Sequence, residues 1–300
     1  MDMRDCVIIG GGPAGLTAAI YLARYRRRVA VLDAGRSRAR LVPRSRNCPG
    51  FAEGISGDDF LAALRQQLSP YGVEFIESEV GSLGRQEDGF LVESAGKAVS
   101  ARTVLLATGI RDRHPPIDDH ETAVRDGIVR YCPICDGYDS ADRSVCVIGP
   151  LPEAAAKARF LRSFTSRIVV AALQDGHGGD EEASATLESL GIRVRPFAPG
   201  QRLQRNAHGI DVRFADGDLQ NFDVVYPAMG ADVAAELGRG VGAATDATGC
   251  LIVDSHNRTD VQGLYAAGDV VADLHQIAVA VGHAALAATA IHNDLPFAPL

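Results

Sequence analysis

The stretch DCVIIGGGPAGLTAAIYLARYRRRVAVLDAG, residues 5–35, decides the fold of this 300-residue chain. Its first letters describe a short apolar strand that ends in glycines. The next segment, PAGLTAAIYLARYRRR, has apolar residues at helical spacing and closes on arginines, the charge that a helix C-terminus favours. VAVLDAG then has the composition of a second strand. The order strand, helix, strand predicts a βαβ unit at the start of the chain.

Three glycines in this stretch, Gly10, Gly12 and Gly15, have the spacing G-x-G-x-x-G. In a dinucleotide-binding turn the first makes the tight turn, the second lets the backbone approach a pyrophosphate, and the third lets the helix pack on the strand. Asp33, at the end of the second strand, is a carboxylate of the kind that accepts hydrogen bonds from a ribose diol. A glycine-rich turn that binds nothing is the alternative, and this context argues against it. A dinucleotide site is therefore predicted.

Residues 147–164, VIGPLPEAAAKARFLRSF, repeat the opening pattern, with a helix expected from about Pro152 to Phe164. The proline-rich, charged stretch RDRHPPIDDH before this repeat is typical of a linker. The predicted fold class is α/β: two Rossmann-like (three-layer ββα) domains, with the second inserted into the first. The expected bounds are 1–114 and 236–300 for the first domain and 115–235 for the inserted domain.

The segment YCPICDGY, residues 131–138, brings together two of the six cysteines. Cys132 and Cys135 can close a disulfide, and a helix that starts there would favour the thiolate. Asp136 follows directly and could pass a proton to a departing thiolate. Half of a zinc site is one alternative, but the chain has neither a second Cys-x-x-Cys nor a His-x3–5-His, so no metal is expected. A pair of inert packed thiols is the other alternative, and a redox pair is the favoured interpretation.

The composition is that of an ordinary globular protein, with 46% hydrophobic and 23% charged residues. No apolar run approaches the ~20 residues of a membrane span, and the acidic start is unlike a secretory signal, so a cytoplasmic protein is expected. The net charge of −8 argues against nucleic-acid binding. The stretch from Arg24 to Arg46 carries nine arginines and one acid. We interpret it as a solvated helix end and loop, with a docking patch for an acidic protein as the less favoured alternative.

Two further segments end strands on small residues. GLYAAGDV ends its strand on Gly268 and Asp269, and LLATG ends on Thr108 and Gly109. A carboxylate at such a strand end can bind a sugar-like chain, such as the ribityl of a flavin, or it can cap a helix. Taken alone, neither segment decides between a binding site and a turn.

Taken together, the motifs GGGPAG, NCPGF, ATG, CPICDG, GLYAAGD and HQIA resemble, in their order and spacing, the low-molecular-weight thioredoxin reductases and their flavoprotein relatives. The resemblance covers nearly the whole chain. It implies an FAD-binding domain split around an inserted nicotinamide-type domain that carries the cysteine pair, in a homodimer. Cys135 would then face the flavin, Cys132 would exchange with the partner disulfide, and Asp136 would be the acid.

The same resemblance implies the FAD-binding residues. Around the pyrophosphate it places Gly10, Gly12, Pro13, Ala14 and Gly15. Asp33, where the family more often has Glu, would bind the adenosine ribose. The flavin half would contact Asn47, Thr108, Gly109, Gly268 and Asp269, the last at the ribityl, with Gln276 and Ile277 at the pyrimidine end of the isoalloxazine. His275 stands where the family usually has Arg.

The second dinucleotide motif of the family falls on Gly149, Leu151 and Ala154. Leu151 carries a side chain where a backbone must approach a pyrophosphate. Pro150 and Pro152 remove N–H donors, and Glu153 adds a negative charge where phosphates would lie.

The family's basic His-Arg-Arg, which binds the 2′-phosphate of NADPH, is replaced here by Ala172, Leu173 and Gln174. Asp175 follows, and it suits the ribose of NADH only as a weak rescue of the altered loop. Each lost charge-assisted bond would remove about 1.5–3 kcal/mol of binding free energy. Use of NADPH is therefore not expected, and NAD(P)H as a cofactor is doubtful.

These observations predict an FAD-dependent thiol–disulfide oxidoreductase that passes electrons between the flavin and the Cys132–Cys135 pair. Its partner would be a thioredoxin-like protein or a small dithiol or disulfide. The external electron donor could be an acidic protein such as ferredoxin, or the enzyme could oxidise dithiols and pass electrons to oxygen. An NADPH-dependent thioredoxin reductase ranks third. A non-catalytic flavin redox sensor is the alternative of another class, and the cysteine pair argues against it.

Overall fold

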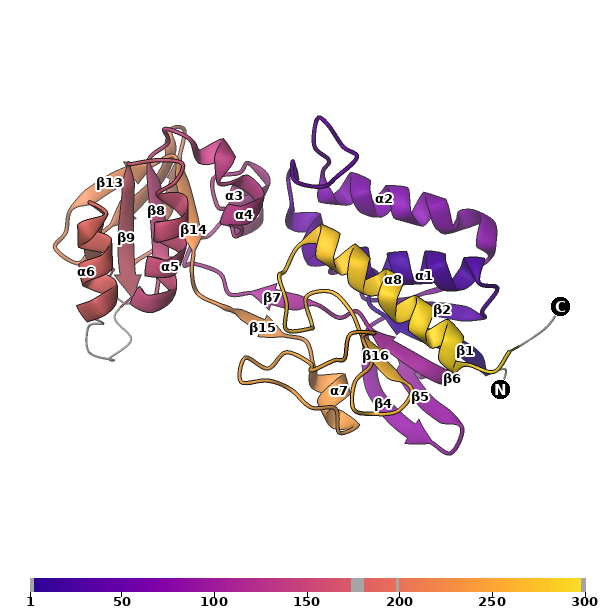
Figure 1. Ribbon diagram of the computed structural model, residues 1–300. Coiled ribbons are helices and arrows are strands. Elements are labelled where there is room, and N and C mark those ends of the chain that lie inside the picture. The colour runs from indigo at the N-terminus through magenta and orange to yellow at the C-terminus, as the bar shows by residue number, and fades with distance from the viewer. Residues whose placement is uncertain (1–2, 174–180, 198–199, 298–300) are drawn as a thin grey trace. The chain divides into compact units, whose positions relative to one another are not determined.

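The computed structural model describes residues 3–173, 181–197 and 200–297, shown in Figure 1. The chain divides into two compact units, which we describe separately. Unit 1 comprises Met1–Arg40, Cys48–Arg111 and Val233–Leu300, and unit 2 comprises Leu41–Asn47 and Asp112–Asp232. Gln174 and Asp175, singled out above, lie outside the described residues.

Unit 1 is built on a seven-stranded sheet with the order β3-β2-β1-β6-β5-β4, and β16 also pairs with β6. Its parallel strands are β1 (Arg4–Ile9), β2 (Val29–Asp33), β3 (Glu74–Glu77), β6 (Lys97–Leu106) and β16 (Leu264–Ala266). The antiparallel strands β4 (Val80–Gln86) and β5 (Gly89–Ser94) extend it beyond β6. Ile9, at the end of β1, is in register with Leu32 and Leu106, and Leu106 is in register with Ala266 at the end of β16. The segments that follow these parallel strands therefore leave the same edge of the sheet.

Both faces of this sheet are covered. One face packs against α1 (Pro13–Arg24) and α8 (Ile277–Asp294), with α2 (Gly57–Leu68) beside α1. On the opposite face, side chains of the sheet, including those of β4 and β5, pack against the segment around α7 (Glu236–Gly240). Ile8 belongs to the first core and its neighbour Val7 to the second, as the two-residue period of a strand requires.

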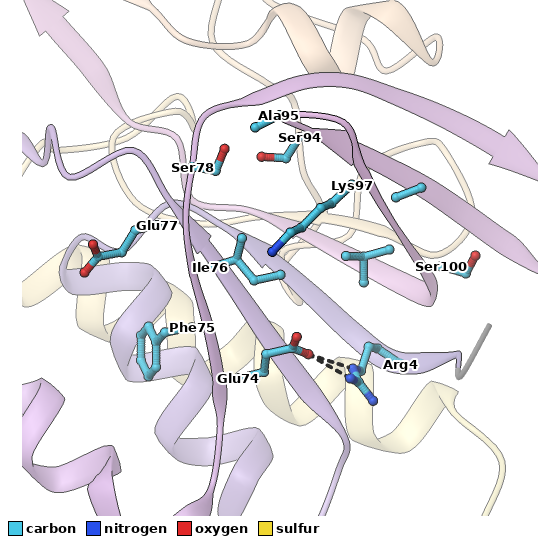
Figure 2. A pocket seen from close by; sticks show the side chains of 12 residues that line it. Arg4, Glu74, Phe75, Ile76, Glu77, Ser78, Ser94, Ala95, Lys97 and Ser100 are labelled. Carbon is cyan, nitrogen blue, oxygen red and sulfur yellow. Dashed lines mark hydrogen bonds and ion pairs between the residues drawn. The ribbon is translucent and has the colours of Figure 1, made fainter.

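A groove of about 700 Å³ lies along β3 and the turn between β5 and β6 (Figure 2). Arg4 and Glu74 form an ion pair across part of it, with Nη2 and Oε2 2.8 Å apart. Its lining, residues 4, 74–78, 94–95 and 97–100, contains none of the predicted cofactor-binding residues. The groove is therefore distinct from the predicted cofactor site.

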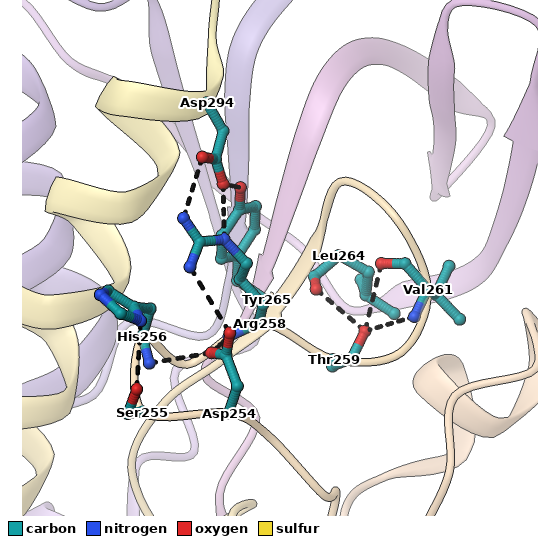
Figure 3. Close-up of polar contacts among 9 residues, drawn as sticks. All are labelled: Asp254, Ser255, His256, Arg258, Thr259, Val261, Leu264, Tyr265 and Asp294. Atoms are coloured by element: carbon teal, nitrogen blue, oxygen red, sulfur yellow. Dashed lines mark hydrogen bonds and ion pairs between the residues drawn. The ribbon is translucent and has the colours of Figure 1, made fainter.

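The C-terminal end of α8 is held to the sheet by a polar cluster (Figure 3). Asp294, the last residue of α8, accepts two hydrogen bonds from Arg258, from Nε at 2.7 Å and from Nη2 at 2.9 Å. The hydroxyl of Tyr265, on β16, donates to the same carboxylate at 2.6 Å. The cluster thus connects three segments of unit 1 at one point.

Unit 2 repeats the plan of unit 1 on a smaller scale. Its parallel sheet has the order β10-β9-β8-β14, formed by β8 (Val145–Gly149), β9 (Ile168–Leu173), β10 (Arg193–Phe197) and β14 (Val224–Pro227). One face packs against α5 (Leu151–Leu161) and α6 (Glu181–Ser189). The other face packs against a three-stranded antiparallel sheet of β11 (Gln204–Asn206), β12 (Gly209–Arg213) and β13 (Leu219–Phe222). Pro196 is tolerated in β10 because that strand lies at the edge of its sheet.

The remaining elements are short. They are β7 (Ile110–Asp112) paired with β15 (Ala231–Val233), α3 (His120–Arg125), α4 (Pro133–Asp136), and 3-10 turns at Arg38–Leu41, Ser69–Tyr71 and Tyr138–Ser140. Each helix in the described part of the chain is too short or too polar to cross a membrane.

The predicted α/β class, with two units of Rossmann-like plan, is confirmed by these two sheets and their helices. Element limits differ slightly from expectation. The helix predicted from about Pro152 to Phe164 spans Leu151–Leu161. The stretch expected to be a linker contains the end of β7 and the first residue of α3.

Candidate active site

The turn between β1 and α1 has the geometry that the three glycines predict. Gly10 has φ +111°, and a Cβ there would lie 2.3 Å from the Ala107 carbonyl oxygen. A Cβ on Gly15 would lie 1.9 Å from the Gly10 oxygen, so this glycine permits the helix to pack on the turn. A Cβ on Gly12 would meet only the Ser37 side chain, with its Oγ at 3.1 Å. Space therefore remains beside the N-terminus of α1, where a phosphate would bind.

The same turn brings the other predicted segments of unit 1 together. A Cβ on Gly10 would lie 3.3 Å from the amide nitrogen of Thr108, and one on Gly268 would lie 3.0 Å from the Cβ of Ala14. Gly11 lies so close to Asp33 that a Cβ on it would be 2.3 Å from Oδ2. Sequence reasoning assigned no role to Gly11, although the absence of its side chain makes room for the carboxylate.

Two arginines that sequence reasoning missed contact the predicted carboxylates. Arg65, on α2, donates from Nη2 to Asp33 Oδ2 at 2.9 Å, and Asp33 also accepts from the Gly35 amide at 3.1 Å. Arg38 donates to Asp269 Oδ2 at 3.3 Å. The arginine-rich composition of residues 24–46 signalled that a partner such as Arg38 was available, whereas no sequence pattern pointed to Arg65. These contacts hold both carboxylates beside the glycine turn.

The remaining predicted residues of unit 1 lie at the ends of its elements. Thr108 donates from Oγ1 to the Ala234 carbonyl at 2.6 Å, so its hydroxyl has a structural contact. Gly109 follows with φ +68°. Gln276 and Ile277 form the start of α8, whose residue Ala280 would lie 3.7 Å from a Cβ on Gly268.

The arrangement fits FAD. The open side of Gly12 at the start of α1 suits a pyrophosphate, and the buried Asp33 carboxylate beside the turn suits a ribose diol. Asp269 lies at the same edge of the sheet, one residue after a glycine with φ +78° that contacts α1. When bound there, FAD would supply reversible two-electron transfer.

Asn47 is placed differently from the other predicted cofactor residues. It belongs to the segment Leu41–Asn47, which groups with unit 2. Its Nδ2 donates to the Ile134 carbonyl at 3.4 Å, and its Oδ1 accepts from Ser45 Oγ at 2.9 Å. A contact with the flavin remains a prediction for this residue.

Cys132 and Cys135 form a disulfide in unit 2, with Cα atoms 5.3 Å apart. Cys132 is the N-cap of α4, and its Sγ accepts from the Cys135 amide at 3.2 Å. Because α4 has four residues, its dipole is that of a single turn. Both cysteines are partly exposed, whereas the four single cysteines are buried and free. Burial raises the pKa of Cys6 and of Cys146 to about 12, which suppresses thiolate formation there.

Asp136, the last residue of α4, lies in a polar network. The Tyr226 hydroxyl donates to its Oδ1 at 2.7 Å, and Arg130 Nη1 donates to its backbone carbonyl at 3.3 Å. Burial holds the pKa of the Asp136 carboxyl above its usual value, and the hydrogen bond from Tyr226 opposes this rise. A carboxyl with a raised pKa beside a disulfide is suited to donate a proton to a departing thiolate.

The second βαβ turn keeps its frame although two of the three glycines are replaced. A Cβ on Gly149 would lie 2.3 Å from the Ala228 carbonyl oxygen, so the first glycine remains necessary. Ala154 is buried where the third glycine is expected. Helix α5 starts at Leu151 with Pro150 as N-cap, and Pro152 and Glu153 are exposed.

Helix α5 also supports the cysteine segment. Lys157 donates from Nζ to the carbonyls of Tyr131, at 3.0 Å, and Pro227, at 2.5 Å. Tyr131 directly precedes Cys132. This gives a structural reason for keeping the helix even where its start has lost the binding motif.

Metal chemistry finds no support among the described residues, where no three His, Cys, Asp or Glu side chains are grouped to hold an ion. The zinc alternative therefore gains nothing from the structure, and the disulfide uses both thiols that it would have required.

Comparison with known proteins agrees with this geometry. The family model of pyridine nucleotide-disulphide oxidoreductases matches residues 4–284. The thioredoxin reductase of Treponema pallidum (strain Nichols) is 30% identical over 295 residues, which cover 95% of each chain. The crystal structure of the thioredoxin reductase from Streptococcus pyogenes superposes with a TM-score of 0.89 at 28% identity and covers 97% of each chain. The crystal structure of HlmI superposes with a TM-score of 0.86 at 29% identity and covers 97% of this chain and 92% of that one. The chain therefore belongs to the pyridine nucleotide-disulphide oxidoreductases, as a thioredoxin reductase-like, FAD-dependent disulfide oxidoreductase.

Proposed function

We propose that this enzyme exchanges thiols and disulfides at Cys132–Cys135, uses FAD held in unit 1, and works without NADPH. The observation that carries the proposal is the start of α5. In the register of the repeated motif, residues 149–154 match residues 10–15, and Pro152 matches Pro13 at the start of α1. Pro150 takes the place of Gly11, so the turn before α5 has lost one N–H donor, and Leu151 and Glu153 replace Gly12 and Ala14.

Charge and shape at the start of α5 point the same way. Glu153 places a carboxylate in the first turn, which opposes the attraction of a helix N-terminus for phosphate. Leu151 fills, with a half-buried side chain, the position where Gly12 leaves space in unit 1. At the end of β9, Ala172 and Leu173 carry no positive charge for a 2′-phosphate. Together these features argue that the contacts which would bind the pyrophosphate and the 2′-phosphate of NADPH are missing.

The chemistry of the pair is a two-step exchange with a dithiol. A substrate thiolate attacks Cys132 Sγ, the Cys132–Cys135 bond breaks, and Cys135 leaves as a thiolate that Asp136 can protonate. The second substrate thiol, once deprotonated, attacks the substrate sulfur of the mixed disulfide and releases Cys132, so the substrate leaves as a disulfide. The pair has then gained two electrons and two protons, and FAD would supply the couple that returns it to the disulfide.

The external partner of the cycle is either oxygen, reduced to hydrogen peroxide, or a reduced protein that drives the exchange in reverse. The ion pairs of the arginines in unit 1 argue against a docking patch for an acidic donor protein, and so favour oxygen as the partner. Arg36 pairs with Glu79, Arg38 with Asp269 and Arg40 with Asp58, so much of this charge is already neutralised within the chain. We therefore rank dithiol oxidation ahead of a ferredoxin-type donor.

The names of the relatives support a second candidate, an NADPH-dependent thioredoxin reductase. In that case the disulfide partner would be a thioredoxin, and in the first case a thioredoxin-like protein or a small dithiol. Under either reading we propose a homodimer, by analogy with the family.

The deciding experiment is anaerobic mixing of the FAD-loaded enzyme with NADPH and then NADH, followed by flavin absorbance. We expect no bleaching with either nucleotide and prompt bleaching with a dithiol such as dithiothreitol. Bleaching by micromolar NADPH would refute the proposal and restore the thioredoxin reductase assignment.

The direction of electron flow needs an aerobic companion experiment. With dithiothreitol and oxygen, we expect multiple turnovers with one hydrogen peroxide formed per disulfide. Cys135→Ser should abolish turnover and retain FAD. Turnover only after addition of reduced ferredoxin and a disulfide would instead identify the protein-donor route.

A further inference from the structure

A buried row of hydroxyls connects the Asp136 carboxyl to Arg130 inside unit 2. Tyr226 and Ser140 are both fully buried. The Tyr226 hydroxyl lies 2.7 Å from Asp136 Oδ1 and 2.8 Å from Ser140 Oγ. Arg130 Nη1 donates to Ser140 Oγ at 3.2 Å. The order Asp136, Tyr226, Ser140, Arg130 is therefore continuous.

The position of the Tyr226 hydroxyl is set by the sheet rather than by a loop. Tyr226 lies within β14 and pairs with Val147 of β8. Its ring belongs to the core between that sheet and α5. A phenol fixed in this way can hold the carboxyl at the end of a one-turn helix in a single orientation.

The row can accommodate Asp136 in both protonation states. When Asp136 is ionised, Tyr226 donates to the carboxylate and accepts from Ser140. When Asp136 is protonated, it donates to the Tyr226 oxygen, and Tyr226 turns its own proton to Ser140. The heavy atoms need not move, because the 2.8 Å contact between the two hydroxyls admits either direction. Such a row is suited to a group that releases and recovers a proton in each cycle.

We propose that Tyr226, with Ser140, is a positioning residue that orients the Asp136 carboxyl and sets its proton affinity during disulfide exchange. The inference rests on the proposed function, in which Cys132–Cys135 is the working disulfide and Asp136 its proton donor. The two hydroxyls act in opposite senses. Tyr226 favours the ionised carboxylate by donating to it. Ser140 favours the protonated form, because only in that form does the Tyr226 proton need Ser140 as its acceptor.

Other charged groups around Asp136 set the background for any titration. Arg130 and Lys157 favour the ionised form, whereas Asp139 disfavours it. Tyr226→Phe leaves all three in place, so its difference from the wild type isolates the contribution of the phenol hydroxyl. Ser140→Ala removes one acceptor of Arg130, whose hydrogen bonds to the carbonyls of Gly127 and Asp136 remain.

The test measures how fast dithiothreitol reduces the Cys132–Cys135 disulfide as a function of pH. Reaction is stopped by alkylation, and the labelled cysteines are counted by mass spectrometry of the FAD-loaded protein. The reduction rate is divided by the fraction of dithiothreitol that is present as thiolate. Any fall of this corrected rate with rising pH then reports deprotonation of Asp136. Asp136→Asn should lack this fall.

Tyr226→Phe should move the midpoint of the fall upward by about one pH unit, a tenfold gain in proton affinity. Ser140→Ala should move the midpoint downward. Tyr265→Phe is the matched control, because it removes a phenol that also donates to a carboxylate, but in unit 1, and its midpoint should equal that of the wild type.

An unchanged midpoint in Tyr226→Phe, or an equal loss of rate at every pH, would show a merely structural role and overturn the inference. If Tyr226→Phe does not fold, an unchanged or raised midpoint in Ser140→Ala would overturn it equally. These outcomes are independent of nicotinamide use, since dithiothreitol is the only reductant. Bleaching of the flavin by NADPH would refute the proposed function and leave the midpoint shifts intact.

Discussion

At the scale of single residues, the role proposed for Asp136 requires it to release a proton, and the ionised carboxylate that results is unfavourable in the folded protein. Its carboxyl is largely withdrawn from water, and burial raises its pKa above the usual value. Ionisation in the folded state is therefore unfavourable relative to the unfolded chain. By linkage, this group contributes stability below its unfolded pKa and loses that contribution as pH rises through the folded pKa.

Asp136→Asn should therefore not lower the melting temperature at pH 8, and should slow disulfide exchange strongly, by on the order of 10²–10⁴-fold if proton donation is lost. The amide oxygen can still accept from Tyr226, so the buried contact survives. Calorimetry and the dithiothreitol assay check the two halves of this expectation. A large drop in melting temperature would mean that the charge itself stabilises the fold.

The glycine turn gives a second residue-scale prediction, because its members differ in what surrounds them. Gly12→Ala should fold and lose FAD affinity, since its Cβ meets only the Ser37 side chain, at 3.1 Å, and would occupy the phosphate side. Gly15→Ala should fail to fold or be severely destabilised, since its Cβ would lie 1.9 Å from a backbone oxygen. Melting of the FAD-free proteins and flavin titration separate the two effects. Equal behaviour of the two variants would contradict this distinction.

At the scale of elements, α8 depends on the polar cluster at its C-terminal end (Figure 3). The cluster joins Asp294 to Arg258 and to Tyr265 of β16, three segments that only tertiary structure brings together. The Arg258 hydrogen bonds hold the pKa of the Asp294 carboxyl below its usual range. A carboxyl of this kind contributes stability above its unfolded pKa and loses it as pH falls through the folded pKa.

Arg258→Ala should cost about 1–2 kcal/mol of unfolding free energy at neutral pH, since its two bonds to the carboxylate are charge-assisted but partly exposed. The difference from the wild type should begin to shrink as pH falls below about 4, the ordinary value of a carboxyl, and should vanish only below the lower pKa of the folded state. Arg239→Ala is the control: its pair with Glu236 on α7 is exposed and 3.5 Å long, so it should change stability by less than about 0.5 kcal/mol. Urea unfolding of both variants at two pH values makes the comparison. Equal losses would show that the bidentate geometry has no special weight.

At the scale of the whole molecule, stability should fall with acid in two stages, the first arising in unit 2 and the second in both units. Burial and the neighbouring His114 lower the pKa of His120 in unit 2, so stability falls as pH drops below the ordinary histidine value of about 6.5. Hydrogen bonds from Ser144 lower the pKa of Asp223, and Arg258 does the same for Asp294 in unit 1, so both units lose stability further below about pH 4. Asp136 acts in the opposite sense.

Melting temperature should therefore decline gently from pH 7 to about pH 5 and steeply below about pH 4. His120→Gln should remove part of the gentle decline, because glutamine does not titrate, and should leave the steep part unchanged. Circular dichroism melts across this range provide the measurement. A profile of His120→Gln that is parallel to the wild type throughout would show that His120 does not contribute.

Much of the fold and part of the site follow from the sequence alone, because their signals are local. The glycine spacing, the helical period of α1 and the position of Asp33 all lie within one βαβ unit, where chain geometry dictates the neighbours. The disulfide is equally local, since its cysteines are three residues apart. The altered start of α5 is visible for the same reason: prolines at a helix start remove donors in any context.

Only the tertiary structure decided which partners hold these groups. Arg38 contacts Asp269 across 231 residues of chain, and Tyr226 contacts Asp136 across 90. Nothing in the local pattern marks Tyr226 as other than a core residue of β14, because a buried strand position favours an aromatic ring with or without a hydroxyl. Its partner is determined by where β14 and α4 meet in unit 2. Local spacing thus specified the cofactor turn and the redox pair, whereas long-range packing selected the residues that tune them, because contacts between distant segments exist only once the sheets have formed.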